Sequence, residues 1–223
     1  MALNKLKFNS INVTPAANQG LKFNSSADGF ETGSAGGSMT FIKKLTASSS
    51  ANLSFVDGSS DVVLDNTYKE YLFIFNNLHP GDSSNNNLFS VNMSVDSGSN
   101  YNVAKTTTNI EIYHAESGSA SGIGYVTGKD LAQGTGIQKL SAEIGSGNDE
   151  CCSGFLHLFN PSSTTFVKHF ISHVQGTYTA GGPYSINHKV AGYCNTTSAI
   201  DAVQFTYNTG NIDAGTITLY GIN

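Results

Sequence analysis

The chain has 223 residues, of which only 12% are charged, and its formal net charge at pH 7 is −5. A weakly acidic chain lacks the basic surface that binding to nucleic acid or to an anionic membrane requires. No apolar run approaches the roughly 20 residues that span a bilayer, and the N-terminal stretch MALNKLKFNS lacks the apolar segment of a signal peptide. We therefore expect no nucleic acid and no membrane as partners, and assembly in a reducing cytosol.

The composition predicts an all-β protein. The chain contains 24 Gly, 13 Phe and 10 Tyr and has no Trp. β-Branched and aromatic residues alternate with turn formers, and runs of strong helix formers are missing. A chain of this length buries about 70% of its unfolded surface, which is enough for one large core.

The first 38 residues form a separate unit in this interpretation. The pentapeptide LKFNS occurs at 6–10 and again at 21–25, and a turn signal at Asp28-Gly29 precedes a Gly/Ser-rich linker. We expect an extended N-terminal arm that buries its apolar side chains against a neighbouring subunit. The alternatives are a disordered tail or a first hairpin tucked under its own domain. The expected anchoring residues are Leu6, Phe8, Ile11, Val13, Leu21, Phe23 and Phe30.

From residue 39 the sequence changes to short strands and turns. Strands are expected at 39–46 and 52–56, and the apolar run 68–77 is expected to be a central strand covered on both faces. A loop is expected over 78–87. In the following strand, 87–95, the apolar residues occupy alternate positions, which places all of them on one face. These residues are Phe89, Val91, Met93 and Val95.

Further strands follow in the second half. The segment 109–115 alternates, with Ile110 and Ile112 expected to face inward, and 137–144 fits either a helix or a strand, with flanking glycines favouring the strand. Residues 154–174 predict a hairpin around Pro161. The final strands, 199–207 and 215–223, complete a jelly-roll-like antiparallel β-sandwich over 39–223, whose last strand lies inside a sheet.

Three histidines could approach one another on that hairpin. His169 and His173 are four residues apart and share a face of a strand, and His157 lies on the opposite strand. A cluster of three imidazoles could bind zinc or nickel. The alternative is half-buried histidines with separate hydrogen-bond partners. No carboxylate lies near them in sequence, so we expect no metal and no other cofactor.

The three cysteines, Cys151, Cys152 and Cys194, have no disulfide-framework spacing. We expect three reduced thiols. A vicinal disulfide or a two-cysteine metal site is the alternative, but the second ligand pair that zinc requires is missing.

Nothing in the sequence indicates catalysis. Two acid pairs could be nominated for glycoside hydrolysis, but their spacing does not distinguish them from the other acids. These pairs are Asp130 with Glu143 and Asp149 with Glu150. The segment 146–150 is interpreted as a polar loop, with calcium binding as the alternative. Nucleophile-elbow and phosphate-loop motifs are absent, and we expect a non-enzymatic protein.

Three segments resemble virion structural proteins of tailed bacteriophages, of the kind found in aquatic and marine viral genomes. They are SVDSGSNYNV at 94–103, LHLFNPSSTTFVKHFIS at 156–172, and the C-terminal segment that ends in GTITLYGIN. The segment GLKFNSSADGFE at 20–31 also resembles the short β-threads of phage fibres. The resemblance covers most of residues 65–223 and brings no catalytic residues with it.

The resemblance implies a protein of the particle exterior. It would be a capsid decoration or cement protein, a head fibre, or a tail fibre or spike subunit. We expect a homotrimer in the virion, assembled in the bacterial cytoplasm and bound to the major capsid protein or to a tail protein. The alternative function is a host-surface glycan-binding module, with Tyr and Asn side chains from 78–87 and 176–187 making the contacts.

Overall fold

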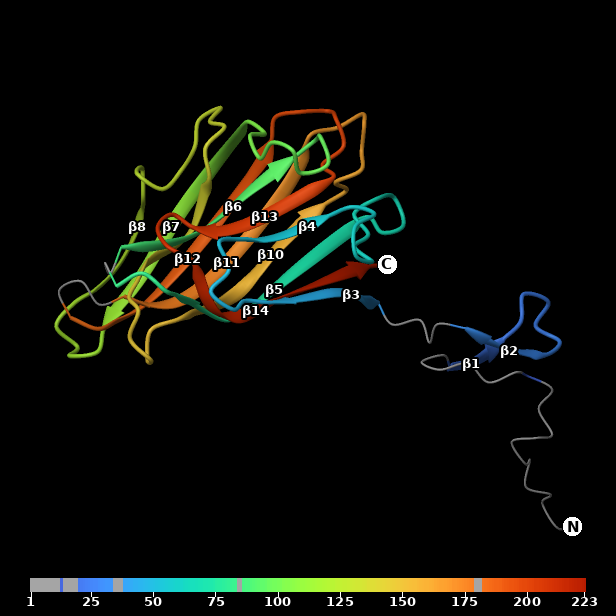
Figure 1. Cartoon of the computed structure of the whole chain (residues 1–223), viewed down its shortest axis with the longest axis horizontal. Coiled ribbons are helices and arrows are strands. Elements are labelled where there is room, and N and C mark those ends of the chain that lie inside the picture. The colour runs from blue at the N-terminus through green and yellow to red at the C-terminus, as the bar shows by residue number, and fades with distance from the viewer. Residues whose placement is uncertain (1–12, 14–19, 34–37, 84–85, 179–181) are drawn as a thin grey trace, which may run out of the picture. The chain divides into compact units, whose positions relative to one another are not determined.

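The computed structural model describes residues 13, 20–33, 38–83, 86–178 and 182–223. The chain divides into two compact units, Met1–Ser38 and Met39–Asn223. All regular structure in the described residues is β-strand (Figure 1), which confirms the all-β prediction. The strands are β1 (Gly20–Phe23), β2 (Phe30–Gly33), β3 (Met39–Thr46), β4 (Leu53–Val56), β5 (Glu70–Pro80), β6 (Asn87–Ser94), β7 (Lys105–Ala115), β8 (Ser121–Tyr125), β9 (Gln138–Ile144), β10 (Cys152–Phe159), β11 (Lys168–Tyr178), β12 (Tyr184–Cys194), β13 (Ala202–Tyr207) and β14 (Ile212–Ile222).

The first unit contains an antiparallel hairpin of β1 and β2 rather than an extended arm over 20–33. Phe23 pairs with Phe30 at the turn end, and their rings stack with centroids 4.9 Å apart. Asn24 holds the turn, because its side-chain oxygen accepts hydrogen bonds from the backbone N–H groups of Asp28 and Gly29. The predicted Asp28-Gly29 turn is confirmed, and the second LKFNS copy supplies β1 and the start of this turn. The first copy lies outside the described residues.

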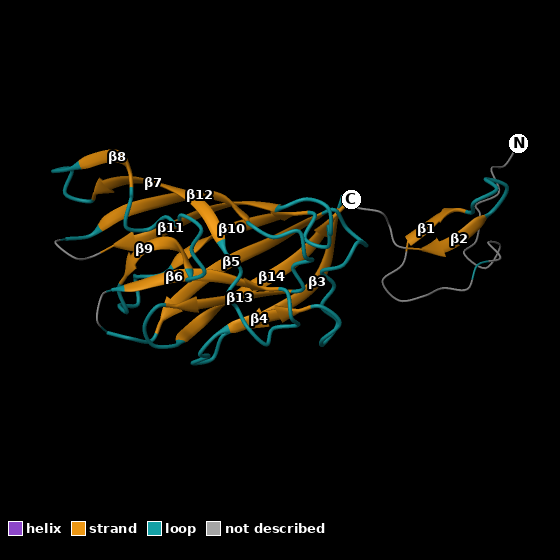
Figure 2. Ribbon diagram, turned by 90° about the horizontal axis from the view of Figure 1, so that it is seen from above, coloured by secondary structure: helices purple, strands orange, loops and turns teal. Residues whose placement is uncertain are grey.

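The second unit is an antiparallel sandwich of two sheets of unequal size (Figure 2). The large sheet has eight strands in the order β3-β14-β5-β10-β11-β12-β7-β8, and the small sheet has four in the order β4-β13-β6-β9. The last two strands return to the first half of the chain: β13 lies between β4 and β6, and β14 lies between β3 and β5. This wrapping confirms the jelly-roll-like sandwich and the internal position of the last strand.

An aromatic cluster forms the centre of the core between the two sheets. Phe205 on β13 contacts the rings of four other phenylalanines, at centroid distances between 5.1 and 6.3 Å. These four are Phe55, Phe73, Phe75 and Phe89, and each is at most 1% exposed. The rings come from both sheets, so they join the two layers.

Two predicted strand faces differ from the structure. In β5 only alternate residues are buried, so this strand lies in the middle of a sheet but is not covered on both faces. In β7 the prediction is reversed: Ile110 is 38% exposed, whereas Lys105 and Asn109 are fully buried. Polar groups of other segments cover the inner face of β7. Polar side chains are therefore buried there, and the isoleucines are not required on that face.

Other segments agree better with the sequence. The ambiguous segment 137–144 forms strand β9, with Leu140, Ala142 and Ile144 buried. The hairpin of β10 and β11 is present. In β6, Phe89, Val91 and Met93 are buried as predicted, but Val95 is 40% exposed and follows the strand. The expected loops over 78–87 and 176–187 are shorter, because β5, β11 and β12 extend into them.

Candidate functional site

The large sheet extends past the small one at its β7 and β8 side. β9, the edge of the small sheet, packs against β11 and β12, and the loop 126–136 covers the inner face of β7. Backbone bonds hold this loop: Val126 N–H donates to the Asn109 carbonyl at 3.0 Å, and Thr107 N–H donates to the Leu131 carbonyl at 2.9 Å. The strand is therefore covered by a loop rather than by the apolar core.

A lysine from this loop joins two carboxylates. The Nζ atom of Lys129 lies 3.2 Å from Oε2 of Glu143 on β9 and 3.5 Å from Oε2 of Glu111 on β7. The lysine side chain is only 9% exposed. A buried ammonium requires charged or polar partners, and the two carboxylates supply them from both sheets.

A buried histidine lies behind Glu111. His188 on β12 is 1% exposed, and its Nε2 is 3.2 Å from Glu111 Oε2. The Asn109 side-chain nitrogen donates to the carbonyls of Lys129 and Lys139, which leaves Asn109 Oδ1 to accept from His188 Nδ1 at 2.8 Å. Burial, together with the Lys129 ammonium, lowers the pKa of His188 to about 3. The ring is therefore neutral at neutral pH, with its proton on Nδ1.

Beyond Glu111 the inner face opens into a cleft of about 400 Å³. Its lining residues are Glu111, Tyr113, Ala120, Tyr178, Tyr184 and Ile186. The strand register brings them together: Tyr184 pairs with Tyr178 on one side and Ala115 on the other, and Tyr113 pairs with Ile186.

The Tyr184 ring contacts the rings of the other two tyrosines. The Tyr184 ring centroid is 6.0 Å from that of Tyr113, edge to face, and 5.9 Å from that of Tyr178. Burial, helped by the carboxylates of Glu143 and Glu111, raises the pKa of Tyr178. The Tyr178 phenol therefore stays neutral. Each of the three tyrosines offers an apolar ring face together with a hydroxyl group.

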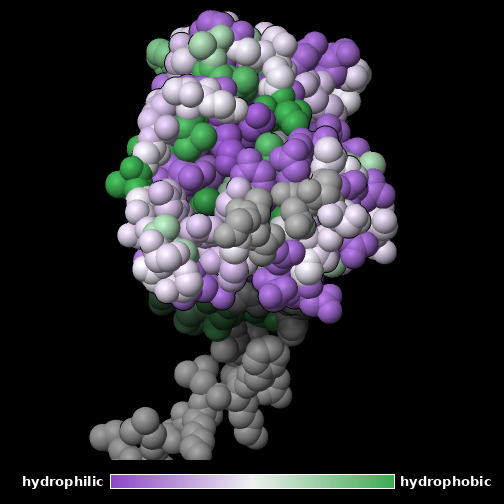
Figure 3. Space-filling model, turned by 90° about the vertical axis from the view of Figure 1, so that its left-hand side faces the viewer, coloured by the Kyte–Doolittle hydropathy of each residue, from purple (hydrophilic) through white to green (hydrophobic). Residues whose placement is uncertain are grey.

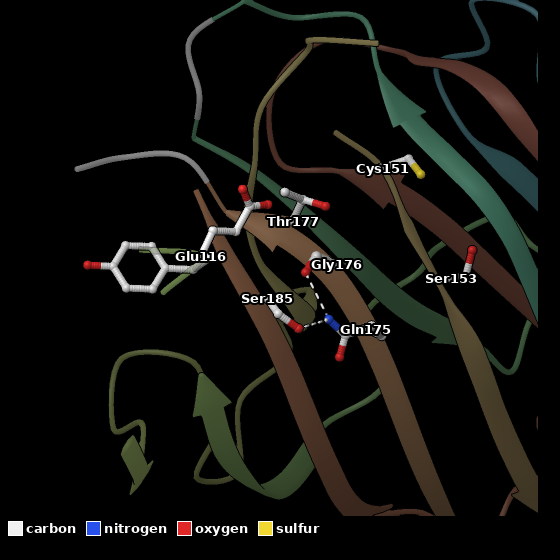
Figure 4. A pocket seen from close by; sticks show the side chains of 8 residues that line it. Glu116, Cys151, Ser153, Gln175, Gly176, Thr177 and Ser185 are labelled. Atoms are coloured by element: carbon white, nitrogen blue, oxygen red, sulfur yellow. Dashed lines mark hydrogen bonds between the residues drawn. The ribbon is translucent and has the colours of Figure 1, made fainter. Parts of the chain in front are cut away.

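A second hollow of about 260 Å³ shares Tyr184 with this cleft. Its labelled residues are mostly small and polar (Figure 4). Gln175 Nε2 donates to Ser185 Oγ at 3.0 Å and to the Gly176 carbonyl at 3.1 Å. Figure 3 views the end of the sandwich at which β7 ends, and hydrophilic residues gather in the middle of that face. Gln175 is in phase with His173 and Ser185 pairs with Thr177, so the strand residues of this hollow belong to the outer face of the sheet. We call the cleft on the inner face alone the tyrosine site.

The structure does not bring the three predicted histidines together as metal ligands. His157 Nε2 lies 3.0 Å from Glu70 Oε2, and His173 Nε2 lies 2.8 Å from Asn187 Oδ1. The His169 ring is next to Tyr193, at 6.1 Å. They share the outer face of the large sheet, but each has its own partner. In the part of the chain that the structure describes, no three His, Cys, Asp or Glu side chains form a group that could hold a metal ion.

The other nominated residues are also separate. Asp130 accepts a 2.6 Å hydrogen bond from the Tyr125 hydroxyl, and Glu150 accepts one from the Gly147 N–H at 2.7 Å. Only Glu143 belongs to the tyrosine site's supporting network. All three cysteines are free; Cys152 and Cys194 are buried and Cys151 is partly exposed.

The expected anchoring residues fall into two groups. Leu21, Phe23 and Phe30 are 51%, 66% and 46% exposed on the hairpin, and Val13 is partly exposed. Leu6, Phe8 and Ile11 lie outside the described residues.

Sequence reasoning missed Glu111, Lys129 and His188, although it suggested contacts from 176–187, which contains Tyr178 and Tyr184. The available signal was the alternation of Asn109, Glu111 and Tyr113 between isoleucines. The sequence prediction placed the opposite face of this strand, which carries the isoleucines, toward the core.

Comparisons with known proteins identify no relative: no family model, no curated protein and no solved structure matches this chain. Within the described residues, none of the secondary structure is a helix of the length and hydropathy that a membrane crossing needs. Any function must therefore be argued from the sequence and from the geometry above.

Proposed function

We propose that this chain is a non-enzymatic structural protein on the exterior of a tailed-phage particle. It would act as a capsid decoration, cement or head-fibre protein, or as a tail fibre or spike subunit. The first unit would anchor a homotrimer to neighbouring subunits, including the major capsid protein or a tail protein. The resemblance of the 94–103, 156–172 and C-terminal segments to such proteins supports this assignment.

The exposed Phe23–Phe30 pair carries the proposal. A two-stranded hairpin is marginally stable alone in water, and this one has four-residue strands. Its largest apolar side chains lie stacked but uncovered. Burying a Phe or Leu side chain stabilises by about 1.5–3 kcal/mol, so docking of this hairpin on another subunit would order it and hold the subunits together.

The outer face of the large sheet also exposes apolar side chains. Paired strands place Phe155, Ile171 and Ile110 on this face, and they are 37%, 49% and 38% exposed. In the strand register, His173 and Lys189 lie between Phe155 and Ile110, so this face mixes apolar with polar side chains, as the rim of an interface does.

The geometry of the two carboxylates favours a role without catalysis. A glycoside hydrolase needs the space between its two carboxyl groups for the glycosidic bond or a water molecule. Here the Lys129 ammonium occupies the space between Glu111 and Glu143.

Sedimentation of the full chain tests the anchoring role. We expect the wild-type chain to be a trimer and to be detected by antibody on purified particles of the phage that encodes it. The double variant Phe23→Ser/Phe30→Ser should be monomeric and absent from particles, with unchanged unfolding of the sandwich. The matched control is Phe166→Ser, which removes a phenylalanine that is 69% exposed in the second unit and should leave the trimer intact. A monomeric wild-type chain would refute the proposal.

A further inference from the structure

We propose that the tyrosine site binds a saccharide with neighbouring free hydroxyl groups and does not hydrolyse it. The inference goes beyond the structural role and does not depend on it. It gives the glycan-binding alternative a defined location on the inner face of β7, β11 and β12.

The tyrosines supply the apolar part of such a site. Sugar rings have apolar C–H faces, and these pack against aromatic rings. Tyr113, Tyr178 and Tyr184 contribute three contacting rings to one cleft, and Ala120 and Ile186 add apolar surface. A volume of about 400 Å³ lies within the range of small-molecule sites, about 300–1,000 Å³.

Glu111 supplies the polar part. Its ion pair with Lys129 is made through Oε2, which leaves Oε1 for a ligand in the cleft that Glu111 lines. A carboxylate oxygen accepts hydrogen bonds from hydroxyl groups, and a charged acceptor forms stronger bonds than a neutral one. The tyrosine hydroxyl groups add both donors and acceptors.

The supporting network holds Glu111 in place before a ligand arrives. Lys129 fixes it from the loop, and the Lys129 ammonium is itself held by Glu143 on β9. A side chain that is already ordered loses little conformational entropy on binding.

The charge of the site selects among sugars. Glu111 and Glu143 share a single ammonium, that of Lys129, and Glu116 lines the adjoining hollow. The site therefore carries net negative charge and would repel uronic or sialic acids. Neutral and amino sugars are the compatible class.

Saturation-transfer NMR and titration calorimetry with the full chain test this site. The probes are the methyl glycosides of glucose, galactose and N-acetylglucosamine, together with glucosamine, glucuronic acid and tetramethylammonium. We expect binding of at least one neutral or amino sugar and none of glucuronic acid. Tyr184→Ala and Glu111→Gln should each weaken binding about tenfold or more, which is the loss of one good contact. Tyr184→Phe keeps the ring and should stay within about threefold of wild type.

Tyr193→Ala is the matched control, because this tyrosine lies on the same strand as Tyr184 but on the opposite face of the sheet. It should bind like the wild type, and thermal unfolding of every variant shows whether the fold is kept. The inference is overturned if no sugar binds, if Tyr193→Ala loses as much affinity as Tyr184→Ala, or if only tetramethylammonium binds. Release of reducing sugar from a bound disaccharide would overturn the non-hydrolytic part. None of these outcomes bears on the trimer, which is measured separately.

Discussion

Acid should destabilise this protein through His188. The pKa of this imidazole is 6.5 in an unfolded chain and about 3 in the folded one, because burial and the Lys129 ammonium disfavour its protonation. The unfolded state therefore binds the proton first as the pH falls, and the stabilisation present above pH 6.5 is lost progressively down to about pH 3. At about 1.4 kcal/mol for each pH unit, this one group accounts for a loss of about 2–3 kcal/mol between neutral pH and about pH 4.5.

Urea denaturation at about pH 7, 5.5 and 4.5 measures this loss. In His188→Gln the side chain no longer titrates, so the free energy of unfolding should fall by about 2–3 kcal/mol less than in the wild type over the same range. The starting stability of the variant does not matter, since the slope is the readout. Equal slopes for the wild type and His188→Gln would refute the assignment of a neutral, buried imidazole.

Two further predictions concern other parts of the second unit. A thiol reagent at about pH 8 should label only Cys151 in the native protein and all three cysteines in urea. Burial raises the pKa of Cys152 and Cys194 to about 12, so rapid labelling of a second thiol in the native protein would contradict the prediction. Gly215→Ala should lower the free energy of unfolding, measured by urea denaturation, by about 2–4 kcal/mol, because Gly215 has φ of 107° and an added Cβ would lie 2.4 Å from a backbone oxygen of β5. Gly128→Ala, where the added Cβ has open space around it, should stay near wild type.

The sequence was sufficient to predict the inward face of a strand wherever apolar side chains face the aromatic core. In β6, Phe89, Val91 and Met93 are buried as the alternation predicted, although the polar residues of the other face are buried as well. For β9, flanking glycines correctly favoured a strand over a helix. In these segments the hydrophobic effect decides which face is inward, and the period of the pattern reports it directly.

The tyrosine site was not predictable in the same way. Alternation in β7 defines two faces, but it does not say which face is inward. Ile110 was assigned to the core, whereas the structure buries Asn109 against His188 and the loop carbonyls. That choice depends on Lys129 and Glu143, which are distant in sequence, and no local pattern indicates that they would meet Glu111. The same reasoning explains the histidine prediction, because the shared face was correct but Glu70 and Asn187 reach it from other strands.

Because the two sheets differ in size, the core that stabilises the fold and the cleft proposed for recognition lie in different parts of the sandwich. The four-stranded sheet covers only part of the eight-stranded one, and the phenylalanine cluster around Phe205 lies where the two overlap. Past β9 no strand of the small sheet covers the large one. A loop therefore supplies the hydrogen-bond partners of the polar groups on the inner face, and space remains at the strand ends. Because large cavity and strain penalties arise in the packed region, the cleft around Tyr184 can vary in sequence with little effect on the core. A sandwich of this design can thus present a polar recognition surface on a rigid support.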